Sequence, residues 1–98
     1  MSTMMLTVSV KPESRAEVEA AVAKMFSAIE REQPEGVRYA SCRLGDSDTF
    51  VILLQLAGSE NPLAAVPEFR TFQDNLKNWL AGPPARDELT VVGSYNLF

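Results

Sequence analysis

The chain of 98 residues contains no histidine. Histidine is the side chain most often used as a general base near neutral pH, the commonest ligand of transition metals and the usual proximal ligand of haem iron. Its absence removes histidine-based acid–base chemistry and argues against a haem or transition-metal site. We therefore expect no cofactor.

Cysteine is almost absent as well, because Cys42 is the only one in the chain. A lone cysteine forms no intramolecular disulfide and no cysteine zinc cluster. Cys42 lies in a predicted strand, where a lone cysteine usually acts as a small apolar side chain. We expect Cys42 to be a small, buried, apolar side chain.

Long apolar runs and clustered positive charge are missing too. No apolar run approaches the ~20 residues that span a bilayer, and the opening "MSTMMLTVSV" is typical of a strand rather than of a signal peptide. Nine Lys and Arg are scattered along a chain of net charge −4, whereas nucleic acids are bound by clustered basic side chains. We expect a cytoplasmic protein that binds neither membranes nor nucleic acids.

Four segments have the composition and alternation of β-strands within a single domain that spans residues 1–98. The turn residues Gly45–Asp48 join the second and third of these strands in a hairpin. The predicted strands are Met4–Val10, Val37–Leu44, Thr49–Leu56 and Glu88–Phe98.

Two segments have helical periodicity. Ser14 and Glu17 form a predicted capping box at the start of the first helix, which should end before Gln33. Asn61 is a predicted N-cap of one short helical turn, and Pro67 opens a longer second helix that stops before Gly82.

The order βαββαβ is the ferredoxin-like arrangement, an α+β fold with a four-stranded antiparallel sheet. Right-handed crossovers place both helices on one face of that sheet. The segment Phe50–Leu56, "FVILLQL", nevertheless has apolar residues on both of its faces. Because monomers rarely expose a large apolar patch, we expect a homodimer that packs sheet against sheet, with Tyr95 at the seam.

The chain resembles the antibiotic-biosynthesis-monooxygenase (ABM) family of dimeric α+β barrel proteins. The resemblance runs from "MLTVSVKPESRAEVEAAV" through "FVILLQLAGSENPLAAVPEFRTFQDNLKNWLAGPP" to "LTVVGSY", with "VPEFRTF" as its best anchor. It implies two identical subunits whose sheets form a barrel, and a small apolar pocket between helices and sheet in each. Family activities include cofactor-free oxygenation of phenolic or quinone-like molecules, quinol oxygenation and haem degradation.

The chain also departs from the family pattern. Glu68 stands where many members have histidine, and Leu54 and Leu56 stand where many have Glu and Trp. The haem-degrading members resemble it least, because they use a histidine ligand and an asparagine on the first strand, and both are missing here.

Glu68 is the candidate catalytic base, since an apolar wall raises the pKa of a carboxylate. The alternative is that its charge only complements the dipole at the start of the second helix. Phe69 and Phe72 are candidate pocket residues. Trp79 would stack on a planar ligand or belong to the core.

Tyr39, Ser41 and Arg43 share one face of the second predicted strand. They would present hydroxyl groups and a cation to an anionic oxygen, or form an exposed edge with Arg43 solvated. Two functions follow. The first is an ABM-like protein that binds a small planar hydrophobic molecule and oxygenates it without a cofactor, and the second is a non-catalytic homodimeric binding or assembly module.

Overall fold

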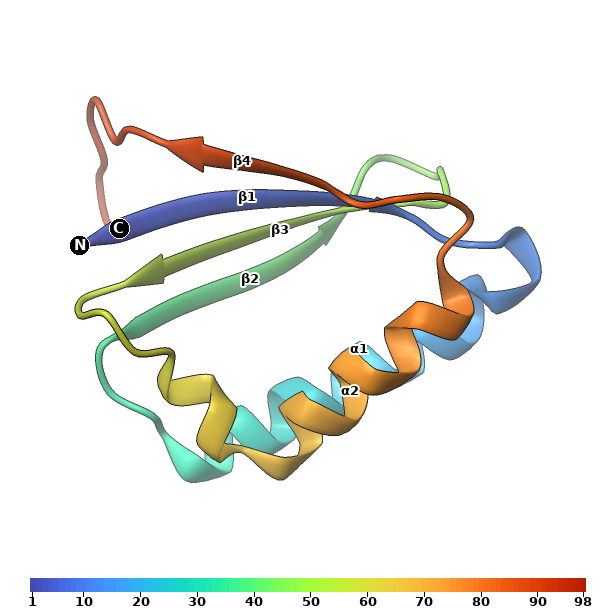
Figure 1. Cartoon of the computed structure of the whole chain (residues 1–98), viewed down its shortest axis with the longest axis horizontal. Helices are drawn as coiled ribbons and strands as arrows, with labels where there is room; N and C mark the ends of the chain where they lie inside the picture. Colours follow the sequence, from blue (N-terminus) through green and yellow to red (C-terminus); the bar gives the residue numbers. More distant parts are fainter.

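The computed structural model describes all residues, 1–98, and has the predicted βαββαβ order (Figure 1). Two short 3₁₀ turns, η1 (Pro12–Ser14) and η2 (Pro62–Ala65), precede the two helices. The helices and strands are β1 (Ser2–Ser9), α1 (Arg15–Glu32), β2 (Val37–Arg43), β3 (Thr49–Leu56), α2 (Pro67–Trp79) and β4 (Ala85–Leu89).

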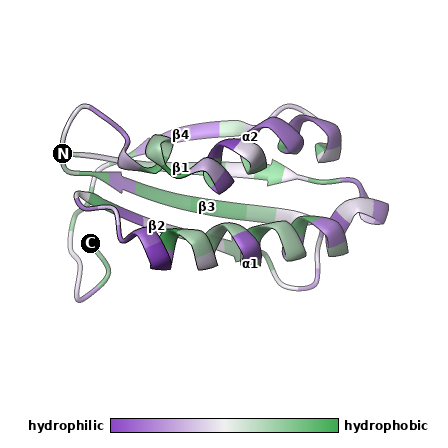
Figure 2. Cartoon of the chain, turned by 90° about the horizontal axis from the view of Figure 1, so that it is seen from below, coloured by the Kyte–Doolittle hydropathy of each residue, from purple (hydrophilic) through white to green (hydrophobic).

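The four strands form one antiparallel sheet in the order β2-β3-β1-β4. Both helices lie on the same face of this sheet, α1 along the β2–β3 side and α2 along the β1–β4 side (Figures 1 and 2). The ferredoxin-like fold predicted from the sequence is thereby confirmed. Neither helix is long and apolar enough to cross a membrane.

The core lies between the helices and the sheet. The register pairs Leu6 with Ile52 and Val8 with Phe50, so alternate residues of the two central strands point at the helices. The helices contribute the apolar stripes that their three- and four-residue spacing predicts. The buried cluster consists of Val8, Val10, Val18, Met25, Phe50, Phe72 and Trp79.

The entry into α2 forms as predicted. The side-chain oxygen Oδ1 of Asn61 accepts a hydrogen bond of 3.0 Å from the backbone N–H of Leu63, which caps η2. Pro67 then occupies the first turn of α2, where its missing N–H has no helical partner to lose. Leu63 itself is fully buried, so the short turn anchors the connection between β3 and α2.

The predicted capping box at Ser14 is wrong. Ser14 is buried, has the helical backbone angles φ −97° and ψ −8°, and makes no capping hydrogen bond through its side chain. The reason is the preceding 3₁₀ turn: the N–H of Ser14 already donates to the carbonyl of Lys11 at 2.9 Å. Lys11 is therefore the extended residue before the helical segment, and Ser14 lies inside it.

The predicted last strand is present, but its predicted bounds, Glu88–Phe98, are wrong. β4 is Ala85–Leu89, and residues 90–98 form no strand. The ladder pairs Thr7 with Ala85 and Thr3 with Leu89, so β4 runs toward the beginning of β1 and has almost no partner residues left beyond Leu89. β-branched composition cannot extend a strand once the neighbouring strand has ended.

Cys42 lies in β2 as predicted, but it is exposed rather than buried. Its pairing partner in the register is Val51, which is flanked in sequence by the helix-facing residues Phe50 and Ile52. Cys42 therefore points to the face of the sheet that no helix covers. This face, which we call the open face, includes Met5, Leu53 and Asp87.

A matched pair of leucines tests this core. Leu63→Ala should lower the free energy of unfolding by about 2–5 kcal/mol, because Leu63 is fully buried and truncation leaves a cavity. Leu44→Ala makes the same chemical change at a side chain that is 61% exposed, and should cost about 0.5 kcal/mol or less. Urea unfolding of both variants measures the difference, and equal costs would contradict the burial of Leu63.

Candidate functional site

A cavity of about 310 Å³ lies between α2 and the sheet. Its volume is at the lower end of the range found for small-molecule sites. Most of its lining is apolar and comes from the helix-facing side of the two central strands and from α2. The lining residues are Met4, Leu6, Tyr39, Ile52, Leu54, Leu56, Asn61, Phe69, Phe72, Gln73, Leu76 and Arg86.

Tyr39 is held in the cavity wall by two aromatic neighbours. Its ring stacks on Phe26, with centroids 5.1 Å apart and planes 9° apart, and meets the edge of Phe69 at 6.0 Å and 74°. Such contacts fix ring orientation. Burial raises the pKa of the Tyr39 hydroxyl to about 12, and a hydrogen bond with the Ser41 side chain lowers that pKa by a smaller amount. At physiological pH Tyr39 is therefore a neutral hydroxyl.

Arg86 is the one charged residue of the cavity lining. It lies on the edge strand β4 opposite Leu6, on the side of the sheet that faces the helices. The ion pairs of the chain use Arg15, Arg31 and Arg43 and leave Arg86 unpaired. An apolar cavity with one unpaired cation can bind a flat apolar molecule that carries a negative charge or an ionisable hydroxyl.

Arg86 was not among the residues predicted from the sequence. The predicted strand began at Glu88, because the polar run "ARDEL" lacks the β-branched residues that indicate a strand. The available signal was alternation: Arg86 and Glu88 lie two apart and therefore on one face. Leu6 and Met4, their partners on β1, identify that face as the one under the helices.

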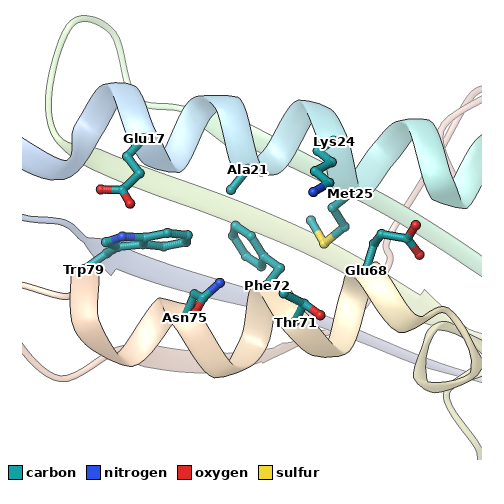
Figure 3. Close-up of a pocket in the computed structure, with 9 residues that line it drawn as sticks. All are labelled: Glu17, Ala21, Lys24, Met25, Glu68, Thr71, Phe72, Asn75 and Trp79. Atoms are coloured by element: carbon teal, nitrogen blue, oxygen red, sulfur yellow. The ribbon is translucent and has the colours of Figure 1, made fainter.

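A second hollow, a groove of about 270 Å³ between α1 and α2, contains two other predicted site residues (Figure 3). Phe72 and Trp79 line it, with ring centroids 5.9 Å apart, and both are buried. Phe72 lies between the two hollows and lines both. Trp79 lines only the groove and belongs to the core cluster, which favours the core interpretation of this residue.

The helical spacing explains this division. Residues 68, 72, 75 and 79 recur at steps of four and three and share one stripe, which faces α1 across the groove (Figure 3). The neighbouring stripe faces the sheet and the cavity. That second stripe consists of Phe69, Gln73 and Leu76.

Glu68 is half-buried at the start of α2 and lines the groove, not the cavity. The carboxylate oxygen Oε2 lies 3.2 Å from Nη2 of Arg31 on α1. Two hydrogen bonds hold the pKa of the Glu68 carboxyl below its usual value. The larger effect comes from its own backbone N–H and the smaller from the side chain of Arg31. This is opposite to the raised pKa expected for a catalytic base, and it favours the helix-start role.

Arg43 does not line the cavity either. Its guanidinium contacts Glu19 on α1, lies 3.5 Å from Asp46 and donates from Nε to the carbonyl of Gly45 at 2.9 Å. Arg15, at the start of α1, also donates a hydrogen bond of 2.8 Å to the carbonyl of Asp46 in the same hairpin. Arg43 thus ties the β2–β3 hairpin to α1, a role that neither sequence interpretation included.

Of the six site residues predicted from the sequence, the structure brings Tyr39, Phe69 and Phe72 together around one cavity. Nowhere in the chain do three His, Cys, Asp or Glu side chains gather closely enough to hold a metal ion.

No protein-family model matches the chain, and no curated protein matches it by sequence. Solved structures do match. A Nitrosomonas europaea protein provisionally assigned as an antibiotic biosynthesis monooxygenase is 17% identical, with a TM-score of 0.76 over 95% of this chain and 100% of that chain. Rv0793 from Mycobacterium tuberculosis is 14% identical, with a TM-score of 0.74 over 95% and 96%.

A third structure, from Caulobacter crescentus, is also provisionally assigned as an antibiotic biosynthesis monooxygenase. It is 19% identical to this chain, with a TM-score of 0.70 over 94% of this chain and 90% of that chain. The agreement extends over nearly the full length in each case. The chain therefore has the fold of the antibiotic biosynthesis monooxygenases.

The raised pKa of Tyr39 has a consequence for stability. In the unfolded chain a tyrosine ionises near pH 10, whereas Tyr39 in the fold ionises near pH 12. The fold thus loses stability as pH rises from about 10 to 12, by about 2–3 kcal/mol in total, and keeps this contribution below pH 10. Urea unfolding at a series of pH values measures it.

Tyr39→Phe removes the ionisable group, so its unfolding free energy should fall less steeply over this range. Tyr95 is 90% exposed and serves as the control. Tyr95→Phe leaves Tyr39 as the only tyrosine of the chain, so this variant should show tyrosinate absorbance only near pH 12 or on unfolding. Early ionisation of Tyr39 in the Tyr95→Phe chain would contradict its burial.

Proposed function

We propose that the chain is a cytoplasmic homodimer in which each subunit binds a small planar hydrophobic molecule, phenolic or quinone-like, and oxygenates it without a cofactor. The observation that carries the proposal is the cavity under α2, with apolar walls, one neutral hydroxyl and one unpaired guanidinium. The chain also shares its fold with proteins provisionally assigned as antibiotic biosynthesis monooxygenases, and this supports the monooxygenase part of the proposal.

The shape of the cavity suits a flat ligand. Phe69 and Phe72 on α2 lie on one side, and Ile52 and Leu54 on β3 lie on the other. A planar ring system between these walls would bury both of its faces, at a gain of roughly 25 cal/mol per Å² of apolar surface. In this proposal the Tyr39 hydroxyl would hydrogen-bond an oxygen at the edge of the ring system.

In this proposal Arg86 promotes ionisation of the ligand, a step in which a histidine would otherwise assist. A cation beside a bound phenol or enol favours the ionised form and so lowers the pKa of the ligand. We assign this ionising role to Arg86 rather than to Glu68, because Glu68 lines the other hollow and its lowered pKa makes it a weaker base. The ligand would then lose its proton to solvent at the open rim.

An electron-rich phenolate or enolate can pass an electron to O₂ directly, which is why no cofactor is needed. In a substrate with a methylene group beside the phenol ring, the methylene carbon is oxidised to a carbonyl carbon. One oxygen atom of O₂ enters the substrate, and the other leaves as water with the two methylene hydrogens. The protein has to orient the ligand, favour its anion and exclude bulk water.

The alternative is a non-catalytic binding module. A packed core without a void would have favoured a module that binds nothing, whereas the cavity beneath α2 supports ligand binding. Oxygen consumption with a panel of anthrone- and quinol-type compounds tests whether the protein is also a catalyst. We expect a rate of oxygen consumption above that of the buffer control, and the same rate for Glu68→Gln as for the native chain. If the compounds bind but no oxygen is consumed, the oxygenase proposal is wrong and the protein is a binding module.

The role of Arg86 is tested with a matched arginine on the same side of the molecule. Arg86→Met should weaken binding of an acidic phenol about 10-fold or more, since hydrogen bonds to charged groups contribute about 1.5–3 kcal/mol. Arg70 is exposed on α2 and does not line the cavity, so Arg70→Met should bind like the native chain. Calorimetric titration with each compound gives the dissociation constants.

A second control changes the ligand instead of the protein. The O-methyl ether of the same phenol cannot ionise, so Arg86→Met and the native chain should bind it about equally. If Arg86→Met weakened the binding of both compounds to the same degree, its effect would be one of shape, and the proposed charge pairing would be wrong.

The homodimer rests on the open face of the sheet. Met5, Val51 and Leu53 lie there, and no helix of the same chain covers them. Sheets of this kind pack face to face about 10 Å apart, with their side chains interdigitating. A second copy would supply the missing layer.

Sedimentation of the native chain at micromolar concentration should therefore give a dimer of twice the mass of 10.8 kDa. The Leu53→Glu variant places an unpaired charge in the middle of the proposed interface and should sediment as a monomer. A folded monomer of the native chain at that concentration would overturn the homodimer and leave the cavity proposal untouched.

A further inference from the structure

The groove between α1 and α2 has charged groups of its own, which the proposed oxygenation does not use. On α1 it is lined by Glu17, Ala21 and Lys24, which recur at steps of four and three and so share one stripe. This stripe faces the stripe of α2 that contains Phe72 and Trp79. The two helices run antiparallel, so the start of α1 lies beside the end of α2 (Figure 3).

The floor of the groove is apolar and mostly aromatic. Phe72 and Trp79 are buried, and Met25 is only 1% exposed. Figure 3 shows Ala21 opposite Phe72, at the middle of the groove. Because its side chain is a single methyl group, Ala21 leaves room above the aromatic rings that a longer side chain would take up.

The rim of the groove is polar, and its two free charges have opposite sign. Glu17, Lys24, Thr71 and Asn75 are exposed there. Neither Glu17 nor Lys24 takes part in an ion pair of the chain. Single unpaired charges are ordinary on a protein surface. Here, however, an unpaired carboxylate and an unpaired ammonium lie at opposite ends of one hollow with an aromatic floor (Figure 3).

The negative end of the groove suits an ammonium group. Glu17 lies at this end above the indole of Trp79 (Figure 3). A carboxylate can accept charge-assisted hydrogen bonds from an ammonium, and an aromatic ring attracts the same cation electrostatically. The two side chains together therefore favour a cation between them.

The opposite end of the groove suits a carboxylate. Glu68 lies there, but its charge is offset by Arg31, which pairs with it at 3.2 Å. Lys24 is near enough to lower the pKa of the Glu68 carboxyl by a small electrostatic effect, yet it forms no ion pair with Glu68. The ammonium of Lys24 is therefore the charge that remains free at this end.

We infer that the groove is a second ligand site, for a small dipolar molecule that carries an ammonium and a carboxylate at opposite ends of a flat apolar middle. The ammonium pairs with Glu17 over Trp79, the carboxylate pairs with Lys24, and the middle packs on Phe72. The volume of about 270 Å³ suits a molecule with a single ring. The inference does not depend on the proposed oxygenase, whose ligand binds in the cavity.

The spacing of the two charges limits the ligand further. Glu17 and Lys24 are seven residues apart, so their Cα atoms are separated by about 10 Å along the helix axis. Two hydrogen bonds of about 3 Å leave about 4–5 Å between the charged groups of the ligand, and the flexible stem of Lys24 allows a longer molecule. In an α-amino acid both groups are attached to one carbon and lie too close together. The groove therefore selects molecules with several atoms between the two charges.

Calorimetric titration with 4-(aminomethyl)benzoate tests the site. This probe has a single ring between an ammonium and a carboxylate. Benzylamine lacks the carboxylate and 4-methylbenzoate lacks the ammonium, so each is a matched control for one charge. The native chain should bind the dipolar probe about 5-fold or more tightly than either control compound, since an ion pair at a partly exposed site contributes up to about 1 kcal/mol.

Two variants locate each charge of the probe. Glu17→Gln should weaken the binding of 4-(aminomethyl)benzoate and benzylamine about 5-fold and should not weaken that of 4-methylbenzoate. Lys24→Met should weaken 4-(aminomethyl)benzoate and 4-methylbenzoate but not benzylamine. Glu30→Gln and Lys77→Met are the matched controls, because both residues are exposed, unpaired and outside the groove. These controls should bind all three compounds like the native chain.

A third variant separates the groove from the cavity. Ala21→Met places a longer side chain over Phe72 and should abolish binding of the dipolar probe, while an acidic phenol still binds in the cavity. Arg86→Met should bind the dipolar probe like the native chain, since Arg86 lines only the cavity. Circular dichroism confirms that each variant is folded. If Ala21→Met does not fold, the variants of the exposed residues Glu17 and Lys24 decide the question.

The outcomes separate this site from the proposed oxygenase. Absence of probe binding at millimolar concentration, or variants of Glu17 and Lys24 that bind like their controls, overturns the groove site and leaves the cavity proposal untouched. Weaker probe binding by Arg86→Met, with Ala21→Met unaffected, places the probe in the cavity and also overturns the groove site. Equal losses for all three compounds in both charge variants overturn the dipolar ligand. Failure of oxygen consumption concerns the cavity alone.

Discussion

Two helices cannot cover both faces of a four-stranded sheet, and this constraint organises the whole molecule. β3 lies in the middle of the sheet and is apolar on both sides. Phe50 and Ile52 point to the helices and complete the core, while Val51 and Leu53 point to the open face. The first side closes within the chain. No helix of the chain covers the second side, and residues 90–98 lie over one end of it.

The same constraint separates two kinds of site. The helix side is enclosed, and the cavity forms there because the aromatic side chains of α2 do not fill the space above β1 and β3. The enclosure also gives Tyr39 its raised pKa. The open side has a hollow of its own, of about 490 Å³, but it lies at one end of the sheet and is lined by Thr3, Leu89 and residues of the segment 90–98.

The sequence predicted the parts of the fold that depend on local pattern. Alternation placed β3 at Thr49–Leu56 with both bounds correct, and Asn61 with Pro67 marked the start of the second helical segment. It failed where a strand depends on its neighbour. The polar run "ARDEL" pairs with β1, whereas the more β-like residues 90–98 do not, because β1 has ended.

The candidate site was predicted only in part for a related reason. Phe69 and Phe72 follow from the apolar stripe of α2, but a stripe broad enough to contact both α1 and the sheet does not tell which residues face which. Glu68 and Trp79 therefore joined the cavity residues in the prediction, although they line the groove. Arg86 could be recognised only after the register of β4 with β1 was known.

The position of Arg86 explains how an unpaired charge can line an apolar cavity. Burying an isolated guanidinium at the bottom of the cavity would cost several kcal/mol, and the fold would then need an acidic partner for it. On the edge strand β4 the side chain remains exposed, so its charge stays hydrated. The proposed ligand would cover the rim and remove part of that water. The attraction between the guanidinium and the ligand anion would then be stronger in the drier surroundings, so an edge strand suits a cation that has to be hydrated without ligand and paired with it.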